Sequence, residues 1–312
     1  MSEPVRFVAE GVIPATLVAF HDDFSIDIAA SRKHLRDVVN VGGLSAVTVN
    51  GHASEIHAFT LGEQQSLLAE SLAEAGDELP LVNGVYADGS HAAVEVARMA
   101  AAEGASALLV FPPNSMSMGG QLRPEMAVRH FRMIADATDL PLILFQYPAA
   151  TGLGYPFATM LEIFELVPSI VAIKDWCNDA MLHEKHIRTF QSLPRKVNVL
   201  TTHSSWLMAS LSMQPAGLLS GAGSVIADLQ VALFNAMKTN DLATARAVNE
   251  RIYPVAQAFY TPPFLDMHNR MKECLVLLGR LDRAVVRPPL MKLTDAEIGR
   301  LRAALVASGL LD

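Results

Sequence analysis

Ser169-Ile170-Val171-Ala172-Ile173-Lys174-Asp175-Trp176 carries the strongest structural signal in the chain. Four apolar residues, mostly β-branched, lead directly into a lysine, which is typical of a strand buried on both faces in a parallel sheet. Burial lowers the pKa of a lysine, and the neutral amine can then attack a carbonyl carbon and form a Schiff base. The alternative is a side chain that extends to solvent or pairs with Asp175. Of the seven lysines, only Lys174 closes such a run, which favours the functional interpretation.

The composition allows a large buried core and suits a soluble cytoplasmic enzyme. The 312 residues are 51% hydrophobic with a formal net charge of -8, which argues against nucleic acid or an anionic membrane as the main partner. Cys177 and Cys274 lack the number and spacing of a disulfide framework or a CxxC motif, so we interpret both as free thiols. Because no signal-peptide pattern and no bilayer-spanning apolar run is evident, we expect a cytoplasmic protein.

Strand-like and helix-like segments alternate eight times along the chain. Eight such units at this length favour a (β/α)8 barrel, the TIM barrel, over a doubly wound open sheet. We expect the barrel over residues 1–235 and C-terminal helices over 236–312, packed on it as one structural unit. Ser25 or Asp27 and then Asp88 are the expected caps of the first and third helices. The predicted strands are 11–20, 43–49, 80–85, 105–111, 141–147, the lysine segment, 196–201 and 217–220, and the C-terminal helices are 241–257, 265–279 and 294–308.

Active groups of such barrels gather at the carboxyl ends of the strands. Lys174 would project there into a cup lined by hydroxyl, amide and imidazole groups. Paired carboxylates, a P-loop and a dinucleotide fingerprint are all missing from the sequence, and we expect neither a metal nor a cofactor. The expected catalytic residues are Lys174 and Tyr147, and the expected substrate contacts are His52, Ala53, Ser54, Asn114, Phe145, His203, Ser220 and Gly221.

His183-Glu184-Lys185-His186 offers two imidazoles at i, i+3 spacing on a helix, which can share a metal. This helix would lie outside the barrel, away from the strand ends, and no third ligand is evident, so we interpret it as a solvated face. A metal-dependent aldolase, in which Lys174 is structural and a chelator abolishes activity, is the corresponding alternative.

Four segments, in matching order, resemble the dihydrodipicolinate synthase / N-acetylneuraminate lyase superfamily of Schiff-base aldolases. Gly11–Thr16 resembles the family's opening strand, and Gly51–Glu55 the loop that holds the carboxylate of pyruvate. Phe145–Pro148 with Thr151-Gly152 is similar to its tyrosine-containing turn, and Ile173–Asp175 to the segment of the Schiff-base lysine. The likeness covers roughly residues 8–300. It implies a class I aldolase that binds a small 2-keto acid and an aldehyde, assembled as a homo-oligomer, either a tetramer or a dimer.

Three departures from the family pattern change the expected chemistry. Phe145 stands where the family has its proton-relaying tyrosine, and Tyr147 lies on the same strand face two residues later. Ala150 replaces an arginine that binds the second substrate's carboxylate in the synthases, and Asn114 replaces another relay tyrosine. The resemblance therefore implies an aldolase with a different aldehyde, not a true dihydrodipicolinate synthase. A dehydratase of 2-keto-3-deoxy sugar acids acting through the same iminium, and a catalytically silent barrel that binds a keto acid, are the alternatives.

The proposed chemistry needs an electron sink, a carboxylate anchor and a proton shuttle. Lys174 as an iminium is the sink. Backbone N–H groups and the Ser54 hydroxyl can bind the carboxylate, and Glu55 is interpreted as a brace for that loop. Tyr147, His52 and His203 are the candidate shuttles, since imidazoles exchange protons readily near neutral pH.

Overall fold

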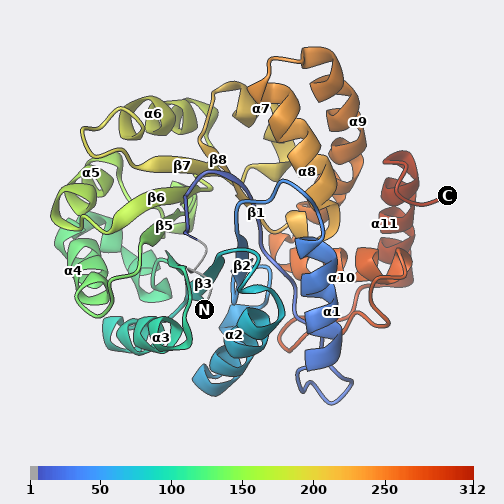
Figure 1. Ribbon diagram of the computed structural model, residues 1–312, viewed down its shortest axis with the longest axis horizontal. Coiled ribbons are helices and arrows are strands. Elements are labelled where there is room, and N and C mark those ends of the chain that lie inside the picture. The colour runs from blue at the N-terminus through green and yellow to red at the C-terminus, as the bar shows by residue number, and fades with distance from the viewer. Residues whose placement is uncertain (1–5) are drawn as a thin grey trace.

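Eight parallel strands form one sheet that curls into a barrel (Figure 1). The strands are β1 (Gly11–Pro14), β2 (Val47–Val49), β3 (Leu81–Val85), β4 (Ala107–Val110), β5 (Leu142–Gln146), β6 (Ile170–Asp175), β7 (Asn198–Thr201) and β8 (Gly217–Ser220). In this computed structural model, which describes residues 6–312, β1 pairs with β8. Isolated bridges Val12–Leu44 and Ala15–Thr48 complete the ring on the other side of β1. This closure confirms the predicted (β/α)8 barrel and excludes the open sheet.

Along β6, successive side chains point alternately into the barrel and outward against the helices. Ala172 belongs to the apolar cluster of the barrel interior, whereas Ile173 belongs to the cluster between sheet and helices. The pairing of β6 with β7 runs without interruption to Asp175. Lys174 therefore faces the interior and Asp175 faces the helices, although the two residues are neighbours.

Helices follow the strands around the barrel (Figure 1). They are α1 (Ile28–Val39), α2 (Leu61–Ala75), α3 (Ser90–Glu103), α4 (Pro124–Ala135), α5 (Phe157–Leu166), α6 (Ala180–Phe190), α7 (Leu207–Ser212) and α8 (Gly223–Lys238). The Asp27 carboxylate caps α1 by accepting from the Ala30 N–H, as predicted. The predicted cap of α3 is wrong: Gly89 holds that position, and the Asp88 carboxylate accepts instead from the N–H of Asn114.

The first strand is shorter than predicted. β1 ends at Pro14, which pairs with Ser220, the last residue of β8, and the chain to residue 20 is irregular apart from single bridges.

Three C-terminal helices pack beside the barrel and are drawn in orange and red in Figure 1: α9 (Leu242–Phe259), α10 (Met267–Leu277) and α11 (Asp295–Ala307). The predicted boundary at residue 235 falls inside α8, which packs along α9. On α10, the buried Lys272 ammonium donates to the buried Glu55 carboxylate at 2.5 Å. The extension is thereby fixed to the loop after β2, close to the carboxyl ends of the strands.

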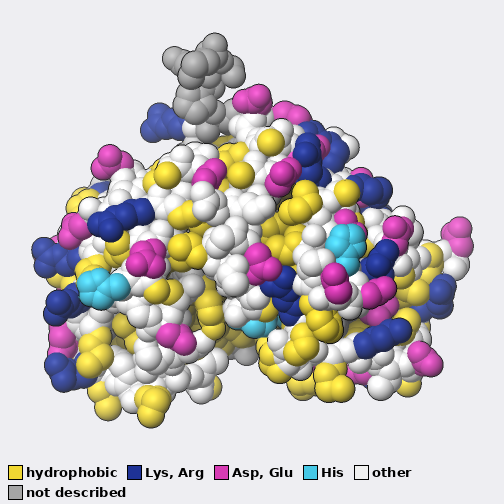
Figure 2. All heavy atoms as spheres, turned by 90° about the horizontal axis from the view of Figure 1, so that it is seen from below, with side chains coloured by type: hydrophobic (Ala, Val, Ile, Leu, Met, Phe, Trp, Pro, Cys, Tyr) yellow, Lys and Arg dark blue, Asp and Glu magenta, His cyan; other side chains and the backbone are white. Residues whose placement is uncertain are grey.

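The face in Figure 2 carries acidic and basic side chains interspersed with apolar ones, without a large patch of one sign. Such a surface agrees with the absence of nucleic-acid signals in the composition. Within residues 6–312, no helix combines the length and apolarity needed to cross a membrane.

Candidate active site

A small cavity lies at the carboxyl ends of the strands. Six of the predicted site residues line it: His52, Ala53, Phe145, Lys174, His203 and Gly221. Ser54, Asn114, Tyr147 and Ser220 are not part of the lining. The other lining residues are Trp176, Asn178, Thr202, Ser204, Ser205, Trp206, Tyr260, Phe264 and Met267.

Lys174 is held in this cavity by the last pairs of β6, opposite Phe145 on β5 and Leu200 on β7. The side chain is only 3% exposed, and its Nζ lies 4.1 Å from the centroid of the Phe145 ring. Within the described residues 6–312, no carboxylate lies within ion-pair distance of Nζ. Burial accordingly lowers the pKa of Lys174 to about 7. A large fraction of this amine is neutral near pH 7, the form that attacks a carbonyl carbon.

The phenol that the family pattern places at position 145 is absent, and Tyr147 lies outside the cavity lining. The Tyr147 ring packs 4.6 Å from Phe145 and 5.1 Å from Trp176, measured between centroids. Burial raises the pKa of the Tyr147 hydroxyl. Aromatic packing accounts for the position of Tyr147.

The loop after β2 is strained into a tight curve, with Asn50 at φ 48° and Glu55 at φ 63°, both in the left-handed region. The Ser54 hydroxyl is used inside this curve, because it donates to the Thr16 carbonyl at 2.7 Å and accepts from the Gly51 N–H. Glu55 braces the loop, as predicted: its carboxylate accepts from Lys272 and from the Arg287 N–H.

His52, at the tip of this loop, presents its imidazole to the cavity. The ring packs edge-on to Phe111 and Phe145, 6.3 Å from each. Burial, together with the nearby His268 and Lys174, lowers the pKa of His52 well below its usual value. Neither ring nitrogen has a hydrogen-bond partner among residues 6–312. His52 is therefore a neutral imidazole in the same cavity as Lys174.

His203 is tightly held. Its Nε2 accepts from the Asn178 N–H at 3.2 Å, its Nδ1 lies 3.1 Å from the Thr201 hydroxyl, and Trp206 stacks on the ring. Burial lowers the pKa of His203 to about 3. Because both ring nitrogens are hydrogen-bonded, the His203 ring forms part of the cavity wall without a free nitrogen for the substrate.

Besides Ser54, the predicted contacts Asn114 and Ser220 also lie outside the lining. Asn114 is exposed after β4 and bonds the hydroxyl of Tyr86. Ser220 is fully buried at the end of β8, where its hydroxyl bonds Ser204 at 2.7 Å and accepts from the Gln230 amide. Both side chains support neighbouring loops.

One wall of the cavity comes from the C-terminal extension, which sequence reasoning missed. Phe264 stacks on Trp176 with centroids 4.6 Å apart, and Tyr260 lies 5.5 Å from Phe264. The Tyr260 hydroxyl accepts from the Ala222 N–H, and His268 on α10 donates to the Ala53 carbonyl. The only signal in the sequence was the aromatic and proline-rich segment between two helices.

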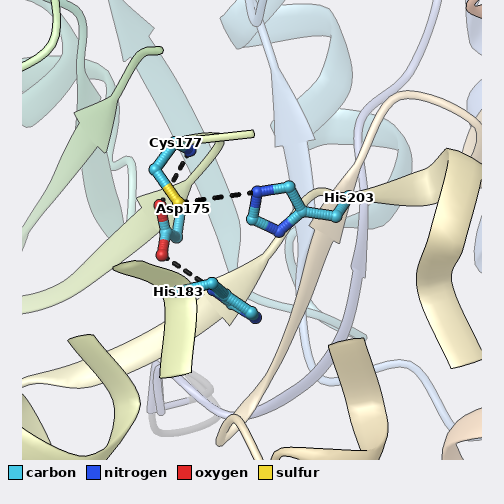
Figure 3. A group of neighbouring side chains, drawn as sticks. All are labelled: Asp175, Cys177, His183 and His203. Atoms are coloured by element: carbon cyan, nitrogen blue, oxygen red, sulfur yellow. Dashed lines mark hydrogen bonds and ion pairs between the residues drawn. The ribbon is translucent and has the colours of Figure 1, made fainter. Parts of the chain in front are cut away.

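The interpretation of residues 183–186 as a solvated face is wrong for both histidines. His183 and His186 are fully buried, and the Nδ1 atoms of both donate to Asp175 Oδ2, at 2.7 and 2.8 Å. Only Glu184 and Lys185 of this segment reach the surface. Because Asp175 faces outward from β6, it meets the inner face of α6, where Cys177 and His203 also lie close by (Figure 3).

Comparison with known proteins places the chain among homologues of similar length. The model of the dihydrodipicolinate synthetase family matches residues 8–308. An uncharacterized DapA-like lyase of Halobacterium salinarum is 29% identical, covering 96% of this chain and 94% of the relative. A probable 2-dehydro-3-deoxy-D-pentonate aldolase of Escherichia coli is 24% identical over 96% of this chain and 98% of the relative. The chain is also similar to the crystal structure of a prophage protein of E. coli K12, a member of the dihydrodipicolinic acid synthase family in complex with pyruvate, with a TM-score of 0.88. The match covers 97% of this chain and 99% of that chain at 22% identity, and it supports the fold alone.

Proposed function

The chain belongs to the dihydrodipicolinate synthetase family, and from this premise we propose that it forms a Schiff base between Lys174 and a 2-keto acid such as pyruvate. Its relatives include lyases and aldolases, and the chain is an enzyme of this class. The reaction is aldol cleavage or condensation with an aldehyde. One observation carries the proposal: the Lys174 amine is buried in the cavity and, among residues 6–312, has no anionic partner.

In the proposed mechanism, the neutral Lys174 amine adds to the C2 carbonyl of the keto acid, and loss of water gives the iminium. The iminium accepts the electron pair of the C3–C4 bond as the aldehyde leaves, and a base takes the proton of the C4 hydroxyl. The resulting enamine is protonated at C3. Hydrolysis then releases the keto acid and restores the amine.

His52 is the proposed proton shuttle. It lines the cavity with Lys174, and its ring nitrogens are free to contact the substrate, whereas both nitrogens of His203 are engaged. Tyr147 lies outside the lining. A neutral imidazole can take the C4 hydroxyl proton and return it to C3.

The keto-acid carboxylate is assigned to the backbone of the loop after β2. The Ser54 and Glu55 N–H groups already donate within this loop, and the Ser54 hydroxyl is engaged. The Ala53 N–H has no acceptor among residues 6–312, and Ala53 lines the cavity. An N–H group at such a curve can bind an anion.

The wall formed by Trp176, Phe264 and Tyr260 points to an uncharged, apolar or aromatic aldehyde. Among the residues 6–312 that line the cavity, Lys174 is the only ionisable basic side chain apart from the histidines. A second carboxylate or a phosphate on the aldehyde would be buried there without a charged partner, which is costly. The exposed Ala150 agrees with this, since it supplies no positive charge either.

Borohydride reduction in the presence of pyruvate, followed by intact-mass measurement, tests the proposal. We expect one reduced pyruvate on the wild type and on Lys185→Ala, which changes an exposed lysine, and none on Lys174→Ala. No adduct with pyruvate or with longer 2-keto acids on the wild type would refute the Schiff base. Product analysis then separates aldol cleavage from dehydration, because dehydration of a 2-keto-3-deoxy sugar acid breaks no carbon–carbon bond.

We also propose that the protein assembles as a homo-oligomer. Met118 and Leu122, in the segment after β4, are 92% and 83% exposed, and Met126, at the start of α4 a few residues later in the chain, is also exposed. Large apolar side chains gathered at one surface commonly mark an interface between copies. Light scattering of the wild type and of Met118→Glu/Leu122→Glu tests this, with a smaller assembly expected for the variant.

A further inference from the structure

Four potential metal ligands converge on the outer side of β6 (Figure 3). Asp175 ends the strand, Cys177 follows in the next loop, His183 comes from α6, and His203 follows β7. One ligand atom of each lies within 4.8 Å of those of the other three, and all four residues are buried. They come from three separate segments of the chain, so the tertiary fold assembles the cluster.

We propose that Asp175, Cys177, His183 and His203 bind a divalent transition-metal ion of the zinc type. A thiolate with two imidazoles and one carboxylate is a donor set that suits zinc. The proposal replaces the expectation from the sequence that no metal is bound, and it does not depend on the Schiff-base chemistry.

All four donor atoms lie within 4.8 Å of one another, and two of the donor pairs can be compared with a tetrahedral site. Metal–ligand distances of about 2.0–2.3 Å put tetrahedral ligand atoms roughly 3.3–3.8 Å apart. The Cys177 Sγ and His203 Nε2 atoms are 3.9 Å apart. The Asp175 Oδ2 and His183 Nδ1 atoms are 2.7 Å apart, joined by a hydrogen bond, and would separate by about half an ångström when the metal replaces the shared proton.

The surrounding groups hold both imidazoles with one nitrogen toward the cluster. His183 Nε2 contacts the Ser210 hydroxyl at 2.8 Å, and His203 Nδ1 contacts the Thr201 hydroxyl at 3.1 Å. Imidazole ligands in metal sites are fixed in this way through their second nitrogen. The Nε2 lone pair of His203 is available for a metal once the 3.2 Å bond from the Asn178 N–H gives way.

A divalent cation would make the cluster electrically neutral, because the Asp175 carboxylate and the Cys177 thiolate together carry two negative charges. Asp175 is fully buried, and no lysine or arginine among residues 6–312 pairs with it. A buried carboxylate requires a compensating charge or several strong donors. A metal ion supplies the charge, while His186 Nδ1 and the Cys177 N–H continue to donate to the carboxylate.

Binding is a simple exchange of protons for the metal. The Cys177 thiol releases its proton to water, and His183 moves the proton from Nδ1 to Nε2, where it donates to Ser210. Because all four positions are filled by protein, the site is structural. It would fix the end of β6 and the loop that carries Trp176 and Asn178 into the cavity.

Metal titration tests the site directly. Full-length protein is stripped with a chelator and titrated with Co²⁺, and zinc content after reconstitution is measured by elemental analysis. We expect one metal per chain, a thiolate-to-cobalt absorption band, and a melting temperature that rises with zinc. Cys274→Ser, which removes the other buried thiol, should keep all three signals.

Cys177→Ser should abolish the thiolate band and weaken zinc binding by about tenfold or more. If Cys177→Ser does not fold, the wild-type titration alone decides. Stripped wild type that binds no stoichiometric metal, or that binds cobalt without a thiolate band, would overturn the proposal. Adduct formation with pyruvate in the chelator-treated protein is measured in parallel, so that failure of the metal site is distinguished from failure of the Schiff base.

Discussion

Replacing Lys272 by methionine should destabilise the protein strongly although the residue lies outside the cavity. The Lys272 ammonium is 1% exposed and donates to Glu55 at 2.5 Å and to the Val285 carbonyl at 2.8 Å. It also lies 4.1 Å from the centroid of the Phe20 ring. Methionine fills a similar volume, so the main change is electrostatic.

The magnitude follows from what the substitution leaves behind. Glu55 is fully buried, and without Lys272 the only donor left to its carboxylate among residues 6–312 is the Arg287 N–H. Removing one partner of a buried ion pair costs about 3–5 kcal/mol, because the remaining charge is uncompensated. Lys272→Met/Glu55→Gln removes both charges, and its cost should be smaller than the sum of the two single substitutions.

Urea unfolding followed by circular dichroism measures these free energies at one fixed protein concentration. Lys33→Met is the control, because Lys33 pairs with Asp37 on the exposed surface of α1, where such a pair contributes about 0–1 kcal/mol. A loss for Lys272→Met below about 1 kcal/mol, or strict additivity in the double variant, would show that the pair does not anchor the C-terminal helices as argued.

Three further outcomes are expected. Burial lowers the pKa of His34 from 6.5 to about 4, so the unfolded chain takes up the extra proton before the folded protein does as the pH falls. The free energy of unfolding should therefore drop by about 3 kcal/mol between pH 6.5 and pH 4. Urea titrations at several pH values measure this slope, and His34→Gln should flatten it. Gly84→Ala should prevent accumulation of soluble barrel, since the new Cβ would lie 1.9 Å from the Asn50 carbonyl oxygen, whereas Gly62→Ala, with open space around it, should express normally. Thr294→Ala removes the capping box of α11 and should cost about 1 kcal/mol in urea unfolding, whereas Thr294→Ser should retain most of it.

The barrel could be predicted because its signals are local. Each strand is a short apolar run, and each helix shows a period that a single window of sequence contains. The strand β8 has the predicted bounds, and the helix α9 begins and ends within two residues of its predicted range. The predictions fail where a side chain bonds a residue distant in sequence instead of its own helix. Asp88 is an example, because its carboxylate accepts from the Asn114 N–H and Gly89 holds the N-cap position of α3.

The candidate site was less predictable for the same reason. The positions of Lys174 and Phe145 in the cavity could be predicted, because both residues lie at strand ends and the cavity of such a barrel opens there. The state of a polar side chain there depends on which atoms reach it, and Ser54 is an example: its hydroxyl bonds the Thr16 carbonyl instead of facing the cavity. No periodicity in the sequence indicates that Tyr260 and Phe264 fold back over the barrel.

The alternation of side chains along β6 explains how Lys174 and the Asp175–Cys177–His183–His203 cluster can be neighbours without Asp175 pairing with the lysine. Alternation along the strand sends Lys174 into an apolar interior, where the loss of hydration favours the neutral amine. The same alternation sends Asp175 to α6, where imidazoles and a thiol surround it. If the carboxylate faced the interior, it would pair with the lysine and keep the amine charged. A metal on the outer side would therefore leave the lysine chemistry intact and act on the loop that positions Trp176 against Phe264, which is the aldehyde side of the cavity.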